Sequence, residues 1–195
     1  MATLVWVSLA VAALAVVGGL AGSVCRAAGR ATAPAKPVYV DLEVLRMIES
    51  GGNDHAVSPA GAKGPYQITR VAWTDAVRSI QASREDVADR PGMLDYDLWV
   101  ENRAVSEAIA HEYINHVLPR YLTARQLHRG DTTGPVPDSL EARLAAYNAG
   151  AMRVRQAYEK SRANWIAHLP LETRDYLSRY ERAATQRREA VRTAD

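Results

Sequence analysis

The sequence predicts an all-α or nearly all-α domain. Apolar residues recur at helical spacing in several segments, and capping residues and glycines mark where these segments begin and end. No stretch of alternating apolar and polar residues rises above noise, and no internal repeat is visible. The chain has 195 residues, of which 48% are hydrophobic and 24% charged, so it is long enough for one domain with a sizeable core. We therefore expect a single helical domain.

The first expected helix follows Asp41, a suitable N-cap, and ends before the pair Gly51-Gly52. Glycine readily adopts the left-handed conformation that ends a helix, so Glu49 falls in the last turn. The apolar positions of this helix are Val44, Leu45 and Ile48.

Two more helices are expected in the middle of the chain, over residues 65–80 and 98–118. Pro119 ends the second of them or bends it, because proline cannot donate the next backbone hydrogen bond. The apolar positions at helical spacing are Ile68, Val71, Ala72, Ala76 and Ile80 in the first, and Val105, Ile109, Tyr113 and Val117 in the second.

Two helices are expected in the C-terminal part. Asp138, with Glu141 three residues later, resembles a capping box that opens a helix ending at Gly150. A final helix begins at Leu171 and frays into an arginine-rich tail over residues 183–195.

The N-terminal residues carry information about location. No charged side chain occurs from Ala2 to Cys25, and residues 4–20 are almost continuously apolar, long enough to cross a bilayer or to form an extended signal-peptide core. We expect membrane contact through residues 4–21. The segment Ala31-Thr32-Ala33 fits a signal-peptidase site, so cleavage and retention both stay open.

These patterns divide the chain into four segments. They are a signal peptide or membrane anchor at 1–25, a linker rich in alanine, glycine and proline at 26–37, the folded domain at 38–182, and the charged tail at 183–195.

Several kinds of site are excluded by composition and spacing. The only cysteine, Cys25, rules out an internal disulfide framework and a cysteine-based zinc site. His111-Glu112-x-x-x-His116 resembles a zinc-protease helix, but a spacing of five turns the two imidazole rings to different faces of an α-helix. No phosphate-binding loop follows a strand. We expect no metal and no cofactor.

One carboxylate stands out by its position. Glu49 lies at the end of an apolar helix and is followed by a loop rich in glycine and hydroxyl groups, from Gly51 to Gln67. If Met47, Ile48 and nearby aromatic residues desolvate its carboxyl group, the pKa of Glu49 rises toward neutral pH, as general acid catalysis of glycosidic bond cleavage requires. An N-acetyl group on the substrate can then replace a second carboxylate.

Three separated motifs extend this pattern. They are Glu49-Ser50-Gly51-Gly52 with the loop through Gly64-Pro65-Tyr66-Gln67, then Ala145-Ala146-Tyr147-Asn148-Ala149-Gly150, and then Glu172-Thr173-x-x-Tyr176. In identity, order and approximate spacing, the chain resembles the lytic transglycosylases of the lysozyme-like superfamily over residues 42–182. Those enzymes cleave the glycan strands of peptidoglycan.

The resemblance implies a role for individual residues. Glu49 would be the acid and base, Ser58 would hydrogen-bond near the scissile sugar, Gln67 would line the cleft, and Tyr147 would lie across the cleft close to Glu49. The family commonly has methionine where this chain has Tyr66, so we expect that residue to form the substrate platform instead.

The resemblance also implies roles for two further residues. Asn148 would order the loop around the site, and Glu172 would support the fold through buried hydrogen bonds.

The implied reaction is non-hydrolytic. Glu49 protonates the oxygen between MurNAc and GlcNAc, the N-acetyl group assists, and the C6 hydroxyl closes onto C1 to leave a 1,6-anhydro end. One alternative is a goose-type lysozyme, which would need a second carboxylate, with candidates Asp54, Asp75, Asp95 and Asp97. Another is a non-catalytic wall-binding scaffold with the same fold.

The expected partners are peptidoglycan strands, together with secretion-system or virion components, and no nucleic acid. Arg26, Arg30 and Lys36 follow the apolar segment and no basic residue precedes it, which by the positive-inside tendency favours a cytoplasmic C-terminal domain. A wall substrate requires the opposite. Either the protein is exported to the cell envelope or periplasm by a weakly charged signal, or it belongs to a phage particle.

Overall fold

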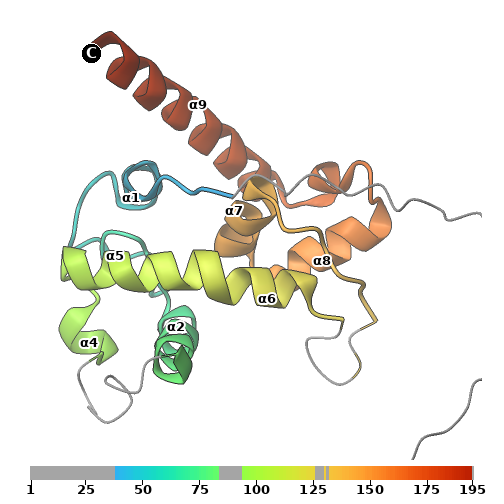
Figure 1. Ribbon diagram of the computed structural model, residues 1–195, viewed down its shortest axis with the longest axis horizontal. Coiled ribbons are helices and arrows are strands. Elements are labelled where there is room, and N and C mark those ends of the chain that lie inside the picture. The colour runs from blue at the N-terminus through green and yellow to red at the C-terminus, as the bar shows by residue number, and fades with distance from the viewer. Residues whose placement is uncertain (1–37, 84–93, 126–129, 131, 195) are drawn as a thin grey trace, which may run out of the picture. The chain divides into compact units, whose positions relative to one another are not determined.

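The computed structural model describes residues 38–83, 94–125, 130 and 132–194, which belong to one compact unit spanning Pro37–Asp195 (Figure 1). Their regular structure is helical, apart from isolated bridges that pair Val57 with Lys63 and Lys63 with Ile68. The expected all-α fold is therefore confirmed. The apolar segment and the linker lie outside the described residues. Within the described ranges, no helix combines the length and the apolar character needed to cross a bilayer.

Helix α1, Leu42–Ser50, forms where the sequence predicts it. The Asp41 carboxylate accepts hydrogen bonds from the backbone N–H groups of Glu43 and Val44. Gly51 ends the helix with φ of 61°, and its N–H bonds the carbonyl of Met47. Glu49 consequently lies in the last turn, with its side chain partly buried.

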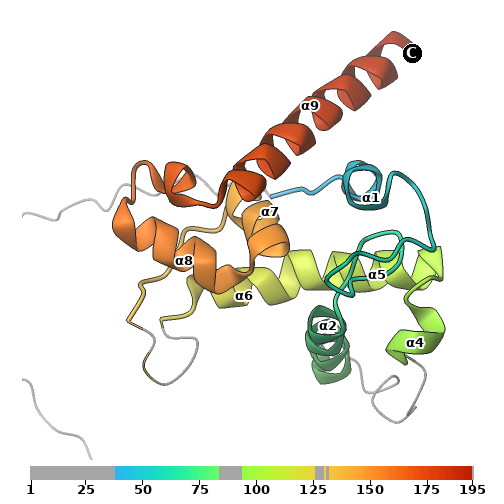
Figure 2. The same ribbon diagram turned by 180° about the vertical axis from the view of Figure 1, so that it is seen from behind.

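The middle of the chain forms a long helical rod with shorter helices packed on it. The elements are α2 (Arg70–Ser83), α4 (Tyr96–Trp99), α5 (Arg103–Glu112), the π-helix η1 (Tyr113–Val117) and α6 (Leu118–Thr123). Helices α5, η1 and α6 follow one another without a break, with α2 and α4 on one side of the rod and α1 on the other (Figures 1 and 2).

Two predicted boundaries in this region are wrong, and one of the two alternatives for Pro119, that it ends the helix, is excluded. Helix α2 begins at Arg70 rather than at residue 65, because Gln67 has a left-handed φ of 47° that interrupts helical backbone. The stretch predicted as one helix over 98–118 is divided, since Asn102 caps α5 and separates it from α4. The rod also continues past Pro119, which lies in the first turn of α6 after the wider π-helical turn.

The C-terminal half consists of four further elements. They are α7 (Leu140–Ala149), α8 (Ala151–Lys160), the 3₁₀ helix η2 (Trp165–His168) and α9 (Leu171–Ala194). Ser139, not Asp138, caps α7 by accepting the N–H of Ala142 at 3.1 Å, while Asp138 instead pairs with Arg143 at 2.6 Å. Helix α9 does not fray after Arg182 but runs to Ala194, and its C-terminal part extends away from the other helices (Figure 2).

The core joins the elements that carry the site. Helix α9 packs against α1 and α7, and α1 also contacts α5. Leu45 of α1, Ile109 and Ile114 of the rod, and Tyr176 of α9 are almost fully buried in this core. Burial of large apolar side chains is the main stabilising contribution here, at about 1.5–3 kcal/mol for each. The packing fixes the C-terminal end of α1, which carries Glu49, against the N-terminal part of α9, which carries Tyr176.

Candidate active site

Glu49 and Tyr176 form the centre of the candidate site. The Tyr176 hydroxyl donates a hydrogen bond to Oε1 of Glu49 at 2.6 Å, although the two residues are 127 positions apart in the chain. Tyr176 is 1% exposed, so its ring is fixed in the core while its hydroxyl reaches the carboxyl group. A short bond to a fixed donor holds that carboxyl group in one orientation.

The electrostatics of the site favour a proton on Glu49 near neutral pH. Burial raises the pKa of Glu49 to about 7, and the hydrogen bond from Tyr176 and the positive charge of Arg179 oppose that rise. At neutral pH both the acid and the carboxylate are therefore populated. A group with this pKa can both donate and accept a proton at the working pH.

Tyr147 of α7 lies within electrostatic range of Glu49. Burial, and after it the negative charge of Glu49, raises the pKa of the Tyr147 phenol well above its usual range. Its hydroxyl donates to the backbone carbonyl of Tyr66 at 2.6 Å, and its ring meets that of Tyr113 edge-on with centroids 6.0 Å apart. Tyr147 thus ties the loop after α1 to α7, next to the carboxyl group.

The loop after α1 is held by side chains that the sequence pattern singled out. Ser58 accepts the N–H of Ala62 through Oγ at 3.0 Å, and its own N–H bonds the Ala62 carbonyl at 2.9 Å. The amide nitrogen of Gln67 donates to the carbonyls of Ala56 and Gly64 at 2.9 and 3.0 Å. Both side chains therefore fix the loop, and the Ser58 hydroxyl proton has no acceptor among the described residues.

Gly64 shows why this loop requires glycine. Its φ is 79°, and an added Cβ would lie 2.1 Å from the backbone carbonyl oxygen of Val100. No real Cβ tolerates that contact with backbone, so the loop packs against the end of α4 only because a side chain is absent.

The expectation that Tyr66 forms a substrate platform is wrong. Its side chain is 0% exposed and its hydroxyl donates to Glu107 of α5 at 3.1 Å. Burial raises the pKa of Tyr66 above its usual range. The turn at Gly64 directs this ring into the core, so only the Tyr66 backbone contributes to the site.

Two other expected roles also differ from the structure. Glu172 is exposed in the first turn of α9, so it makes no buried hydrogen bond. Its negative charge there is stabilised by the positive end of the helix dipole. The next residue, Thr173, is the buried one, at 1% exposed. Asn148 is partly buried, and its side-chain amide makes no hydrogen bond to the described part of the chain. It therefore does not order the loop in the way that was expected.

The four aspartates considered as a second carboxylate have partners of their own. Asp54 pairs with Arg46, Asp75 accepts from Tyr121, Asp95 caps α4, and Asp97 pairs with Arg70. None of them influences the pKa of Glu49, whose perturbing groups are Tyr176 and Arg179. Within the described residues, Glu49 is thus the carboxyl group of the site that is not held by a basic partner or a helix cap.

The two histidines of the rod lie closer than their spacing suggests. A π-helical turn has more residues than an α-helical turn, and η1, which contains His116, follows His111 along the rod. The two rings therefore lie close together, with centroids 6.1 Å apart, and not on different faces of the rod. The spacing argument is therefore wrong for this helix. Even so, no cluster of three or more histidine, cysteine or acidic side chains suited to a metal occurs within the described ranges.

Sequence reasoning missed two residues of the site. Tyr176 belongs to the third motif, but the sequence assigned it no role and gave no sign of its bond to Glu49. Arg179 lay in an arginine-rich stretch, where nothing local distinguishes it.

Comparison with known proteins identifies the family of the chain. The family model described as the transglycosylase SLT domain matches residues 38–169, more than half of the chain. No curated protein and no solved structure gave a match. The matched span includes Glu49, the loop that follows it and Tyr147, and it ends before α9. This match and the three motifs agree with the all-α structure, and the chain belongs to the transglycosylase SLT domain family.

Proposed function

We propose that this protein is a peptidoglycan lytic transglycosylase that cleaves the β-1,4 bond between MurNAc and GlcNAc with Glu49 as its acid and base. Membership of the SLT family implies peptidoglycan as the substrate. The observation that carries the specific reaction is the pairing of Glu49, with a pKa of about 7, to the buried donor Tyr176.

The proposed reaction uses one carboxyl group twice. In its neutral form Glu49 gives its proton to the glycosidic oxygen as the bond from C1 of MurNAc breaks, and the N-acetyl group of the substrate stabilises the positive charge that develops. The resulting carboxylate is stabilised by the Tyr176 hydroxyl. It then takes the proton of the C6 hydroxyl as that oxygen bonds C1. The cycle ends with Glu49 protonated again, and no water is consumed.

The absence of a second free carboxylate in the described site favours this route over hydrolysis. A goose-type lysozyme would use another carboxylate to activate water, and the four aspartates considered for that role are bound elsewhere. With one carboxyl group, an intramolecular hydroxyl held next to C1 is the better nucleophile because its effective concentration far exceeds that of a free reactant.

Two polar groups are suited to hold the sugar near Glu49. The Ser58 hydroxyl proton and the Asn148 amide have no hydrogen-bond partner in the described part of the chain, and both lie in motifs that flank Glu49 and Tyr147 in the sequence. We assign them to substrate binding, whereas Gln67 acts by fixing the loop.

The place of action follows from the substrate. We propose that the protein works in the cell envelope, delivered or anchored by residues 4–21, and opens the wall locally for a secretion or conjugation apparatus or for phage entry. Fractionation with specific antibodies tests this proposal. Recovery with the envelope or in purified virions is expected, and recovery only in the cytosol would contradict it.

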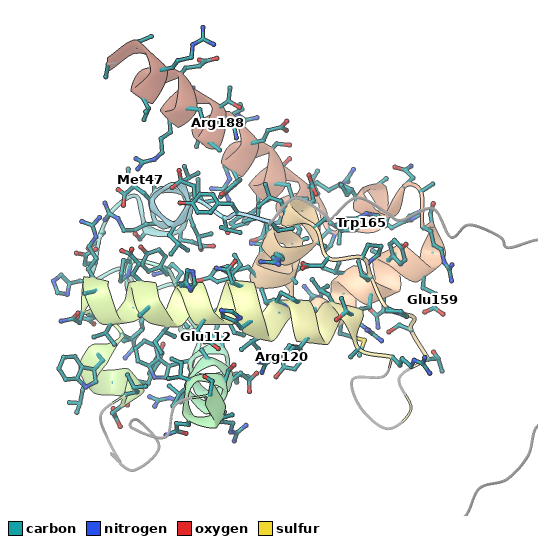
Figure 3. All side chains as sticks on the ribbon, in the orientation of Figure 1. Met47, Glu112, Arg120, Glu159, Trp165 and Arg188 are labelled. Carbon is teal, nitrogen blue, oxygen red and sulfur yellow. The ribbon has the colours of Figure 1, made fainter. Side chains whose placement is uncertain are left out.

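The direct test of activity is release of soluble glycan fragments from purified peptidoglycan by the full chain. Glu49→Gln is expected to abolish release while keeping the fold. Glu159→Gln is a matched control, since Glu159 is exposed on α8 and lies apart from α1 (Figure 3), and it should act as the native protein does. A folded native protein that binds the wall and releases nothing would support the scaffold alternative instead.

A further inference from the structure

Arg179 lies one turn after Tyr176 on α9 and contacts its ring. The guanidinium carbon is 5.7 Å from the centroid of the Tyr176 ring, within the range of a cation–π contact. Arg179 is exposed, and it makes no ion pair or hydrogen bond with any described residue. Most other arginines near α1 are paired with an acid; Arg46 and Arg103, for example, both bind Glu43.

The position of Arg179 connects it to the catalytic carboxyl group. Tyr176, whose ring it covers, donates its hydroxyl to Glu49. The charged or titratable side chains that shift the pKa of Glu49 are Tyr176 and Arg179, both on α9. Tyr147 of α7 also faces Glu49, and the negative charge of Glu49 contributes to the raised pKa of Tyr147 after burial. The nearby acid of α5, Glu107, is bound by Tyr66 and is not among them. Arg179 is therefore the one positive charge that favours ionised Glu49 in the described site.

We propose that Arg179 is a positioning residue that holds the Tyr176 ring in place and stabilises the carboxylate form of Glu49 after its proton has left. This inference rests on the proposed function, because it assigns a task within that reaction.

The need for such a charge follows from the reaction cycle. Burial strongly favours neutral Glu49, which suits the first proton transfer but opposes formation of the carboxylate that the second transfer requires. The hydrogen bond from Tyr176 and the charge of Arg179 both lower the pKa of Glu49 against burial. Burial, and after it the negative charge of Glu49, raises the pKa of Tyr176 well above its usual range, and the positive charge of Arg179 opposes that rise.

Three variants of the full chain test the proposal through the pH dependence of kcat/KM for glycan release. Arg179→Gln removes the charge, so the falling limb of the profile, where Glu49 loses its proton, should move to higher pH and kcat should drop. Arg179→Lys keeps the charge and should hold that limb near its native position. Arg182→Gln removes an exposed arginine of the same helix that makes no contact with the site, and it should leave the profile unchanged.

A second readout separates this inference from the proposed function. The carboxyl carbon of Glu49, assigned by comparison with Glu49→Gln, can be titrated by NMR without any substrate, and its midpoint should rise in Arg179→Gln only. An inactive native protein would refute the proposed function while this titration still tests Arg179. An active protein whose pH limb and carboxyl titration are both unmoved in Arg179→Gln would overturn the role of Arg179.

Discussion

Replacing Glu49 with glutamine should stabilise the fold at high pH while it abolishes activity. The pKa of this carboxyl group rises from 4.5 to about 7 because the folded protein desolvates it. The unfolded chain therefore loses the proton at lower pH than the folded protein does. Stability falls as the pH rises from about 4.5 to about 7 and then stays at the lower level.

The size of the effect follows from the shift. Each unit of pKa difference corresponds to about 1.4 kcal/mol, so ionised Glu49 lowers the free energy of unfolding by up to about 3 kcal/mol above pH 7. Glutamine carries no charge at any pH, and its carbonyl oxygen can still accept the Tyr176 hydroxyl bond. Glu49→Gln should thus match the native protein near pH 4 and exceed it by about 2–3 kcal/mol near pH 8.

Urea unfolding at the two pH values measures this difference. The native protein, Glu49→Gln and the exposed control Glu159→Gln are compared, so that titration of all other groups cancels. If Glu49→Gln raised the free energy of unfolding by the same amount at both pH values, the raised pKa of Glu49 would be refuted. It would mean that the Glu49 carboxyl group is well solvated and ionised at neutral pH, and so is not poised to act as an acid.

Three further predictions concern other parts of the site and the core. Tyr176→Phe removes the donor to Glu49, so the falling limb of the pH–kcat/KM profile should move up by about 1–2 pH units; an unmoved limb in a folded variant would contradict the bond. Gly64→Ala should destabilise the protein by about 2 kcal/mol more than Gly61→Ala in urea unfolding, because both have positive φ but only Gly64 meets backbone; equal losses would exclude that close contact. Arg155→Met should cost about 3 kcal/mol or more by the same measurement, since this fully buried guanidinium binds backbone carbonyls at the end of α6 and in the segment that follows it, and a neutral result would show that those carbonyls find other donors.

Local signals account for what the sequence predicted well. Asp41 and Gly51 delimit α1 because a capping carboxylate and a left-handed glycine act within a few residues of the helix ends. These two positions place Glu49 in the last turn. Gly150 marks the end of α7 for the same reason, which sets Tyr147 near the end of that helix.

Long-range packing accounts for what the sequence could not predict. Tyr66 was expected at the surface of a groove, yet its ring is buried in the core and its hydroxyl donates to Glu107, 41 residues later in the chain. The bond from Tyr176 to Glu49 joins residues 127 positions apart, and no local pattern encodes it. Contacts of this kind depend on how α9 packs against α1.

A local change of helix type also escaped prediction. The spacing of His111 and His116 was interpreted with α-helical geometry, and the π-helical turn that brings their rings together leaves no clear mark in the sequence. Pro119, which has no backbone N–H to donate to the preceding turn, lies two residues after the π-helix.

Digestion of peptidoglycan in ¹⁸O-labelled water tests whether Glu49 cleaves the glycan strand without adding water. The released MurNAc ends are identified by mass spectrometry for the native protein and for Glu49→Gln. We expect 1,6-anhydro ends, lighter by one water and free of ¹⁸O, that disappear in Glu49→Gln. Reducing MurNAc ends that carry ¹⁸O would contradict it and would show that this fold hydrolyses the strand with a second group.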